Sequence, residues 1–363
     1  MYSLEANGYS DAEMREILKS DRSVRYEFDL LDKDEMPLGK ITASGTIDYN
    51  SEVAIQRVAS LNIVEEREID FLSERVRPSM CVDTPNGVAR FPLGVFLMSS
   101  PSRRASSGTI GREIDCYDKC QILADDKFTS RYLVPANTTY VSAISDIITS
   151  AGITDARITP SALEAVAPLE FAMGTSKLEA VNSLLQAINY NNIYADSSGK
   201  LIAAPYVEPT ARSMDCSYVT DKKSITLPNA AEELDIFNAP NKIVRYLETA
   251  DRGVLISEVT NTDPYSKLST VSRGRTIVDI AAVNDIADQA TLDAYTFRIA
   301  TERKIYQKVI FRSAVMPNHE SNDCIYVINK DLDVAGKYIE TAWNIEMRNG
   351  GTMSHSCRKA VSI

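Results

Sequence analysis

A run of short strand-like segments in the first third of the chain is the feature that most constrains the fold. About six extended segments follow one another at roughly ten-residue spacing, including "VRYEFDLLD", "SGTIDYN" and "FPLGVFLMSS". Turn signals at Lys33-Asp34, Gly45 and Asn50-Ser51 separate them. Because many short strands with frequent turns form antiparallel barrels or sandwiches, residues 1–128 are predicted to form a β-barrel-like domain, opened by a short helix at residues 11–20.

Helical periodicity replaces the strand pattern between residues 129 and 206. Thr138 is placed to cap a first helix, which Gly152 ends. Ser176 and Glu179 have the spacing of a capping box at the start of a second helix, because each residue can accept a hydrogen bond from the other's backbone amide. A turn at residues 196–199 then joins "NIYA" to "KLIAAPY" as a β-hairpin. Residues 129–206 are therefore predicted to be an α/β domain set between β-rich parts.

The rest of the chain divides into a loop-rich stretch and a second β-rich domain. Residues 207–239 contain Pro209 and Pro228 and are predicted to be a linker or small subdomain. Residues 240–363 are predicted to form the second β domain, with a helix over about 285–304 and a terminal hairpin. The positions expected to face inward on that helix are Ile286, Ala290, Ala294, Phe297 and Ala300. Alternation in "GKYIETAWNIEM" places Ile339, Thr341, Trp343, Ile345 and Met347 on one face and Tyr338 and Glu340 on the other.

Composition and charge narrow the classes of function. The chain is 44% hydrophobic and 25% charged, as in folded globular proteins. No apolar run approaches the ~18 residues needed to span a bilayer, and the N-terminus lacks the pattern of a signal peptide. We therefore expect synthesis in a cytoplasm and no membrane insertion. The net charge is −11 and the basic residues are dispersed, which argues against a dedicated nucleic-acid-binding surface.

The cysteines do not have the spacing of a metal or redox site. Of the six, Cys116 and Cys120 are close in sequence, but they are four residues apart rather than three as in a CxxC motif. A zinc site would need two more ligands, and the chain has two histidines. Reduced, mostly buried thiols are the favoured interpretation.

Both histidines were considered as catalytic residues. His319 lies in "MPNHESND" near Glu320 and Asp323, which could form a base-and-carboxylate pair. A single histidine among acids in a loop is more often a hydrogen-bonding residue, and His355, in the final strand, is favoured as structural. Nucleophile, phosphate-loop and metalloprotease motifs are absent from the sequence. We therefore expect no catalytic residue, no cofactor-binding residue, no metal ligand and no cofactor.

Four stretches, taken in order, carry a resemblance to a known protein family. The first is "FPLGVFLMSSPSRRASSGTIGREIDCYDKCQILADDK". The second is "TTYVSAISDIITSAGI" with "GTSKLEAVNSLLQAINYNNIYADSSGKLIAAPY", and the third is "NKIVRY" followed by "NTDPYSKLSTVSRGR". The fourth is "PNHESNDCIYVINKDLDVAGKYIETAWNIEMRNGGTMSHSCRK". With the N-terminal strands they cover nearly the whole chain. Their order resembles that of the tail-hub family of tailed bacteriophages, which includes the central baseplate hub of contractile tails and the structural N-terminal part of tail-tip proteins in non-contractile tails.

The resemblance implies a specific architecture. Family members contain two related antiparallel β-barrel-like domains with an α/β insertion, and three chains form a ring with pseudo-sixfold symmetry. Such a homotrimer joins the sixfold tail tube or distal tail ring to the threefold tip. The implied partners are the distal tail or tail tube protein, the tape measure protein and a tip, spike or fibre protein. DNA would pass non-specifically through the channel during genome ejection, and an acidic channel wall would repel it. The implied location is the tail tip or baseplate of the virion.

Two other classes of function remain open on the sequence. A different tail structural protein, such as a distal tail adaptor or a baseplate wedge, would share the β-rich pattern but would assemble differently. A hexamer with one barrel per subunit would indicate the adaptor. A carbohydrate-active hydrolase with unrecognised carboxylates would instead require a deep pocket with paired acids.

Overall fold

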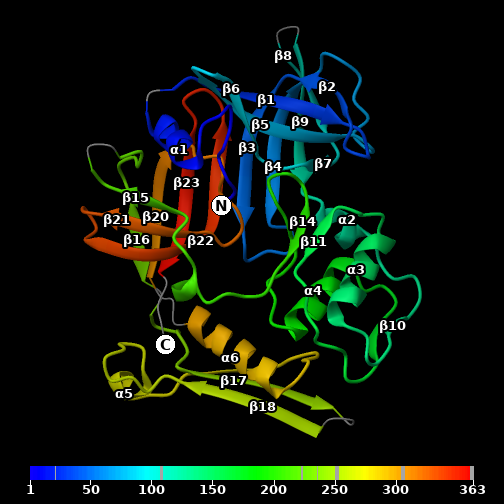
Figure 1. Ribbon diagram of the computed structural model, residues 1–363, viewed down its shortest axis with the longest axis vertical. Helices are drawn as coiled ribbons and strands as arrows, with labels where there is room; N and C mark the ends of the chain where they lie inside the picture. Colours follow the sequence, from blue (N-terminus) through cyan, green and yellow to red (C-terminus); the bar gives the residue numbers. More distant parts are fainter. Residues whose placement is uncertain are drawn as a thin grey trace.

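One large, curved β-sheet forms the frame of the molecule (Figure 1). The computed structural model describes residues 1–20, 22–106, 109–221, 224–234, 236–249, 253–303 and 307–359. Within these ranges fifteen strands belong to the large sheet, and its main path is β16-β20-β23-β22-β3-β4-β9-β7-β5-β1-β2. The strands of the N-terminal half are β1 Val24–Leu31, β2 Pro37–Ile41, β3 Ala43–Asn50, β4 Arg57–Val64, β5 Arg75–Thr84, β6 Gly87–Pro92, β7 Phe96–Met98, β8 Ser102–Ser106 and β9 Thr109–Tyr117. Those of the C-terminal half are β15 Cys216–Val219, β16 Ala231–Leu234, β20 Gln307–Ala314, β21 Cys324–Asn329, β22 Val334–Met347 and β23 Thr352–Lys359.

The sheet is antiparallel except where β15 pairs with β21, and it joins the two ends of the chain through β3 and β22. Across that junction Trp343 lies opposite Tyr49, and their rings stack with centroids 5.3 Å apart. The segment 207–239, predicted to be a linker or small subdomain, supplies β15 and β16 to this sheet. The division of the chain at residues 128, 206 and 239 remains a prediction.

Strand β22 contributes side chains to two separate hydrophobic cores. Trp343 and Ile345 pack in the core of the N-terminal strands, whereas Val334 and Tyr338 pack in the core formed by β15, β20, β21 and β23. A bulge between Glu340 and Ala342 interrupts the register with β23. Because a bulge bends a strand and re-aims its side chains, the single alternation predicted for residues 338–347 does not hold along the whole strand, and Tyr338 and Glu340 are both fully buried.

The helix α1 (Asp11–Lys19) begins at Ser10 with a complete capping box to Glu13. It covers the N-terminal core with Met14 and Leu18. The capping box predicted at Ser176 and Glu179 is present in part. There the Ser176 hydroxyl accepts a hydrogen bond from the Glu179 amide, which is the half of the motif that the structure shows.

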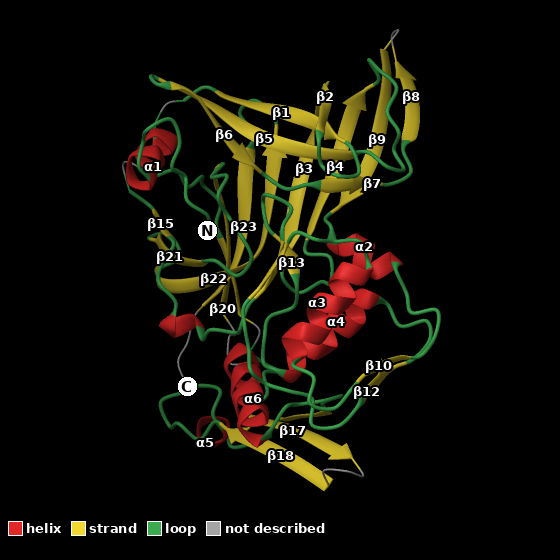
Figure 2. Ribbon diagram, turned by 45° about the vertical axis from the view of Figure 1, so that its right-hand side comes forward, coloured by secondary structure: helices red, strands yellow, loops and turns green. Residues whose placement is uncertain are grey.

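An α/β unit lies beside the lower end of the sheet (Figure 2), and it overlaps the stretch 129–206 but begins earlier, at α2. It consists of the helices α2 Cys120–Asp125, α3 Tyr140–Ser150 and α4 Lys177–Ala187 with the short strands β10 Tyr132–Val134, β11 Ala156–Ile158, β12 Leu169–Phe171, β13 Tyr194–Ala195 and β14 Leu201–Ala203. The predicted hairpin is confirmed, since β13 pairs antiparallel with β14. The cap of α3 is Thr139 rather than Thr138, because the Thr139 hydroxyl accepts the hydrogen bond from the Ser142 amide.

A second small α/β unit follows the short helix η1 (Pro209–Ala211) and the strands β15 and β16. Its three-stranded sheet has the order β18-β17-β19 and is accompanied by two helices. The elements are β17 Lys242–Thr249, β18 Gly253–Thr260, α5 Thr270–Arg273, β19 Val278–Ala282 and α6 Gln289–Arg303. In Figure 1 this unit lies below the large sheet, with α6 between the two.

The predicted inward face of α6 is wrong in part. Ala300 is buried as predicted, but Ala290 and Ala294 are exposed and Phe297 is 39% exposed. The buried stripe contains Leu292 and Thr296 instead. A threonine can occupy this stripe because the Thr296 hydroxyl donates a hydrogen bond to the Leu292 carbonyl at 2.7 Å, so no polar atom is left unsatisfied. Across the described ranges no helix is long and apolar enough to cross a membrane.

Candidate functional site

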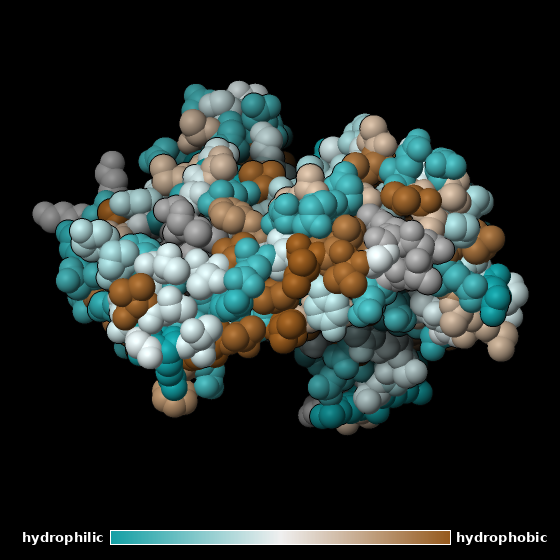
Figure 3. Space-filling view, turned by 90° about the horizontal axis from the view of Figure 1, so that it is seen from below, coloured by the Kyte–Doolittle hydropathy of each residue, from teal (hydrophilic) through white to brown (hydrophobic). Residues whose placement is uncertain are grey.

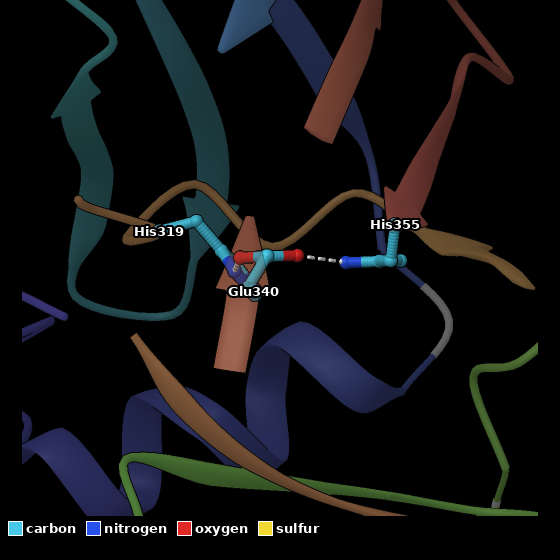
Figure 4. Close-up of side chains that lie close together, drawn as sticks. All are labelled: His319, Glu340 and His355. Atoms are coloured by element: carbon cyan, nitrogen blue, oxygen red, sulfur yellow. Dashed lines mark hydrogen bonds and ion pairs between the residues drawn. The ribbon is translucent and has the colours of Figure 1, made fainter. Parts of the chain in front are cut away.

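The two histidines of the chain, far apart in sequence, lie on either side of one carboxylate (Figure 4). His319 comes from the loop between β20 and β21, His355 from β23, and Glu340 from the bulge of β22. These three residues, here called the histidine cluster, are at most 1% exposed. The cluster lies where β22 passes from one hydrophobic core to the other, so its hydrogen bonds hold the bulge of β22 in place.

Every ring nitrogen of the histidine cluster has a hydrogen-bond partner. The Nδ1 atoms of His319 and His355 contact the two carboxylate oxygens of Glu340, one each. Since an ionised carboxylate accepts only, both Nδ1 atoms donate. On the far sides of the rings, His319 Nε2 lies 2.7 Å from the Tyr218 hydroxyl and His355 Nε2 lies 2.8 Å from Ser313 Oγ. The cluster is therefore fully satisfied although it is buried.

The cluster shifts the pKa values of two of its members. Burial by itself would raise the pKa of Glu340, but the charges and hydrogen bonds of both histidines outweigh burial and lower this pKa to about 2. Burial lowers the pKa of His355 below its ordinary value, although Glu340 opposes that shift. Glu340 is thus ionised throughout the neutral range.

The acids predicted near His319 have other partners. Glu320 forms an ion pair with Arg57 Nη2 at 2.8 Å and accepts a hydrogen bond from the Ser197 amide at 2.8 Å. Asp323 accepts a hydrogen bond from the Glu320 amide at 2.7 Å and contacts the Met1 amino group, while its nearest oxygen is 4.0 Å from His319 Nδ1. Burial raises the pKa of Asp323 to about 7. These contacts connect the β20–β21 loop to β4 and to the β13–β14 hairpin.

The geometry of the histidine cluster favours a structural role over catalysis. The three side chains are closed off from solvent, so a substrate cannot reach the imidazole nitrogens in this conformation. The ligand atoms of the cluster lie within 4.8 Å of one another, as they would around a metal ion. A metal would have to displace both Nδ1–H donors from Glu340, so these residues fit a hydrogen-bonded network better than a metal site.

Sequence reasoning missed Glu340 and Arg57 as partners in this region. Arg57 is 2% exposed and donates to the Leu93 carbonyl at 2.9 Å as well as to Glu320. No local pattern could have identified these partners, since Arg57 and Glu320 are 263 residues apart.

All six cysteines are free thiols. Burial raises the pKa of Cys116 to about 12 and that of Cys120 well above its ordinary value, so both are unreactive at neutral pH.

A different candidate site is an apolar surface on the small sheet β18-β17-β19. Val254 and Ile256 on β18 and Val278 and Ile280 on β19 are each at least half exposed. The register places all four on the side opposite Leu247 and Leu255, which pack in the small core shared with α6. Figure 3 views the molecule from below and shows apolar side chains gathered across this end. We call these four residues the outer sheet face. Exposed apolar patches of this kind mark interaction surfaces.

Comparison with known proteins identifies the fold. The structure matches the tail protein from Neisseria meningitidis MC58 with a TM-score of 0.65 and 12% identity, over 92% of this chain and 97% of that chain. It matches the 43 kDa tail protein of prophage MuSo2 from Shewanella oneidensis with a TM-score of 0.63 and 14% identity, over 92% and 98%. It also matches prophage tail protein gp18 from Listeria monocytogenes EGD-e with a TM-score of 0.53 and 12% identity, over 91% and 94%.

The sequence alone gives no such match: no protein-family model fits it, and no curated protein is similar enough to count as a relative. At 12 to 14% identity the structural likeness establishes a shared fold. The likeness to tail proteins that the sequence suggested is confirmed at the level of the fold, which is mainly β with antiparallel sheets.

Proposed function

We propose that this chain, which has the fold of phage tail proteins, is the trimeric hub of a phage or prophage-derived tail tip. The observation that carries the proposal is the length of the match, since almost the whole chain superposes on almost the whole of the Neisseria tail protein. The hub would join the sixfold tail tube or distal tail ring to the threefold tip. Its location would be the virion tail.

The two hydrophobic cores support the idea of two barrel-like halves in one chain. One core belongs to the N-terminal strands and the other to β15, β20, β21, β22 and β23. We propose that each core is the centre of one barrel-like domain and that residues 129–206 are an insertion between them. Three chains would then present six such domains around a ring, which is the pseudo-sixfold arrangement that a hub requires.

The outer sheet face supports assembly with another copy of this chain. Four half-exposed aliphatic side chains on a three-stranded sheet are fewer than the roughly 20–30 residues that each partner contributes to a standard interface. Phe237 is 70% exposed before β17 and Tyr265 is 94% exposed after β18, so the same small unit carries further exposed aromatic side chains. A ring of identical chains would repeat this surface at every junction, and we propose that it is covered there.

A structural role is proposed in place of an enzymatic one. The buried histidine cluster is closed to substrates, and its single carboxylate already has two hydrogen-bond partners.

The proposed protein partners are the distal tail or tail tube protein, the tape measure protein and a tip, spike or fibre protein. The net charge of −11 per chain would make a trimer strongly acidic, which suits a channel that DNA passes through without binding.

Native mass spectrometry at high protein concentration tests the proposed assembly. A species of about 120 kDa, three times the 40.1 kDa chain, is the expected result. Six copies would replace the hub by the distal tail adaptor, and a persistent monomer at high concentration would contradict self-assembly through this surface.

The variant Ile256→Lys/Ile280→Lys then tests which surface forms the ring. It should dissociate the trimer while leaving the fold of the monomer intact, because both side chains are exposed in the single chain. The matched control is Leu72→Lys, which adds a charge at a 99% exposed leucine in the loop before β5. A trimer that survives the double substitution would show that the outer sheet face is not the contact.

A further inference from the structure

A recessed cavity of about 290 Å³ lies where three parts of the chain meet, apart from the histidine cluster. Thr341 of β22 forms one wall, Asn192 and Tyr206 of the segment around the β13–β14 hairpin form another, and Arg298 of α6 closes a third. Arg212 lines the cavity just after η1. A pocket of this size at a junction between structural units is a common location for a small-molecule or side-chain binding site.

Arg212 is a half-buried cation without a carboxylate partner among the described residues. Its Nε donates to the Val207 carbonyl at 2.8 Å and its Nη1 donates to the Asn322 carbonyl at 2.7 Å. These neutral acceptors orient the guanidinium but do not cancel its charge. Burial accordingly lowers the pKa of Arg212 below its ordinary value.

The other charges that line the cavity are matched in pairs. Arg298 Nε forms an ion pair with Glu302 at 2.9 Å, and Arg358 Nη2 forms one with Glu52 at 2.5 Å. Two glutamates thus accompany three arginines, and the positive charge of Arg212 is the one left over. A ligand that carries one negative charge would complete the set.

Tyr206 supplies a second unfilled binding group in the same place. The guanidinium carbons of Arg298 and Arg212 lie 4.5 Å and 5.7 Å from the centroid of its ring. Its hydroxyl is buried and has no hydrogen-bond partner among the described residues. Burial raises the pKa of Tyr206 to about 12, so the hydroxyl is a donor at neutral pH. A buried donor without an acceptor is destabilising unless a ligand fills the position.

We propose that this cavity binds a carboxylate group, held by the guanidinium of Arg212 and the hydroxyl of Tyr206. A guanidinium matches the planar, bidentate geometry of a carboxylate, and the amide side chain of Asn192 lines the same cavity. The carboxylate could belong to a small dicarboxylic acid or to an acidic side chain of a neighbouring tail protein. The chemistry of recognition is the same in both cases, and it does not depend on the ring.

Isothermal titration calorimetry with sodium succinate, against sodium chloride at matched ionic strength, tests the proposal. We expect saturable 1:1 binding of succinate and no binding of the neutral succinamide. Arg212→Met should weaken succinate binding at least tenfold, whereas Arg104→Met, which removes an exposed arginine of β8, should leave it unchanged. Equal binding of succinamide, or unchanged affinity in Arg212→Met, would overturn the proposal, as would the absence of saturable binding.

Tyr206→Phe provides a second test that does not remove a charge. Without its unpaired hydroxyl the ligand-free protein should be at least as stable as the wild type, while succinate should bind about fivefold more weakly. A purely structural tyrosine would give neither effect. A short peptide with one central glutamate, titrated against its glutamine counterpart, identifies the source: tighter binding than succinate assigns the site to a protein partner, and weaker binding assigns it to a small acid.

Discussion

The histidine cluster and the outer sheet face are opposite departures from the usual partition of polar and apolar groups. The cluster places a carboxylate and two imidazoles in the protein interior, whereas the outer sheet face leaves four aliphatic side chains in solvent. In the histidine cluster every side-chain nitrogen and oxygen has a hydrogen-bond partner within the chain. The side chains of the outer sheet face have no comparable packing partner in the single chain and remain half exposed. The histidine cluster therefore contributes to the stability of the fold, whereas the outer sheet face is available for contact with other proteins.

The largest effect should come from removing the carboxylate of the histidine cluster. Glu340→Ala leaves two buried imidazoles without their acceptor, so we expect a loss of about 3–5 kcal/mol in the free energy of unfolding. Urea denaturation measures this loss. Glu16→Ala, which removes an exposed carboxylate of α1, is the matched control and should change stability by less than about 0.5 kcal/mol. Similar losses in both variants would show that the cluster contributes little.

The pH dependence of stability should report the same carboxylate. Glu340 has a pKa of about 2 in the folded protein and an ordinary value of 4.5 when unfolded, so its contribution is fully present above pH 4.5 and is lost as the pH falls towards 2. The expected loss is about 3 kcal/mol. Urea unfolding at a series of pH values should show this loss in the wild type and not in Glu340→Gln.

Asp323 should contribute with the opposite sign. Its pKa is raised to about 7 in the folded protein, so its contribution is present below an ordinary pKa of 3.8 and is lost as the pH rises through 7. Asp323→Asn should therefore make the free energy of unfolding less dependent on pH between 4 and 7. The loss of stability below pH 4.5, which is assigned to Glu340, should remain. If this variant instead removed the loss of stability below pH 4.5, the assignment of that loss to Glu340 would be wrong.

The two sides of the small sheet should differ strongly in their tolerance of truncation. Leu247→Ala creates a cavity in the core shared with α6 and should cost about 2–4 kcal/mol. Ile256→Ala, on the outer sheet face of the same unit, should cost under about 0.5 kcal/mol in the monomer. Chemical denaturation at low protein concentration measures both. Equal costs would mean that the outer sheet face is already covered within one chain.

The smallest effect should come from the buried hydroxyl of α6. Thr296 donates its hydrogen bond within its own helix turn, so Thr296→Val removes a donor without leaving a distant acceptor unpaired. We expect the free energy of unfolding to change by less than about 1 kcal/mol. A loss comparable to that of Glu340→Ala would show that local and long-range buried polar contacts are equivalent here.

The parts of the fold that depend on local sequence could be predicted. The first helix follows from the helical spacing of its apolar residues. The helix that begins at Ser176 and the hairpin at residues 196–199 follow from a capping residue and turn residues that lie within a few positions of one another. The inward face of α6 could not be predicted from hydrophobicity, because Thr296 takes an interior position by satisfying its own hydroxyl.

The candidate site depended on contacts that local patterns do not encode. The sequence predicts His319 as a hydrogen-bonding loop residue but does not indicate Glu340 as its partner, because the bulge that interrupts the alternation of β22 has no recognisable sequence signal. The pairing of Arg57 with Glu320 similarly requires the sheet to be complete. Contacts between residues that are far apart in the sequence, which depend on the register of the strands, could therefore not be predicted.

The pairing of β3 with β22 has a consequence for synthesis of the chain. The hydrogen-bonded residues Ser51 and Thr341 are 290 residues apart, so β3 leaves the ribosome long before its neighbour exists. At about 5–20 residues per second this delay is on the order of 15 to 60 s. During that time one edge of β3 has no strand beside it and could pair with another nascent chain. We expect yield in a heterologous host to respond to growth temperature and chaperone supply more than to transcript level.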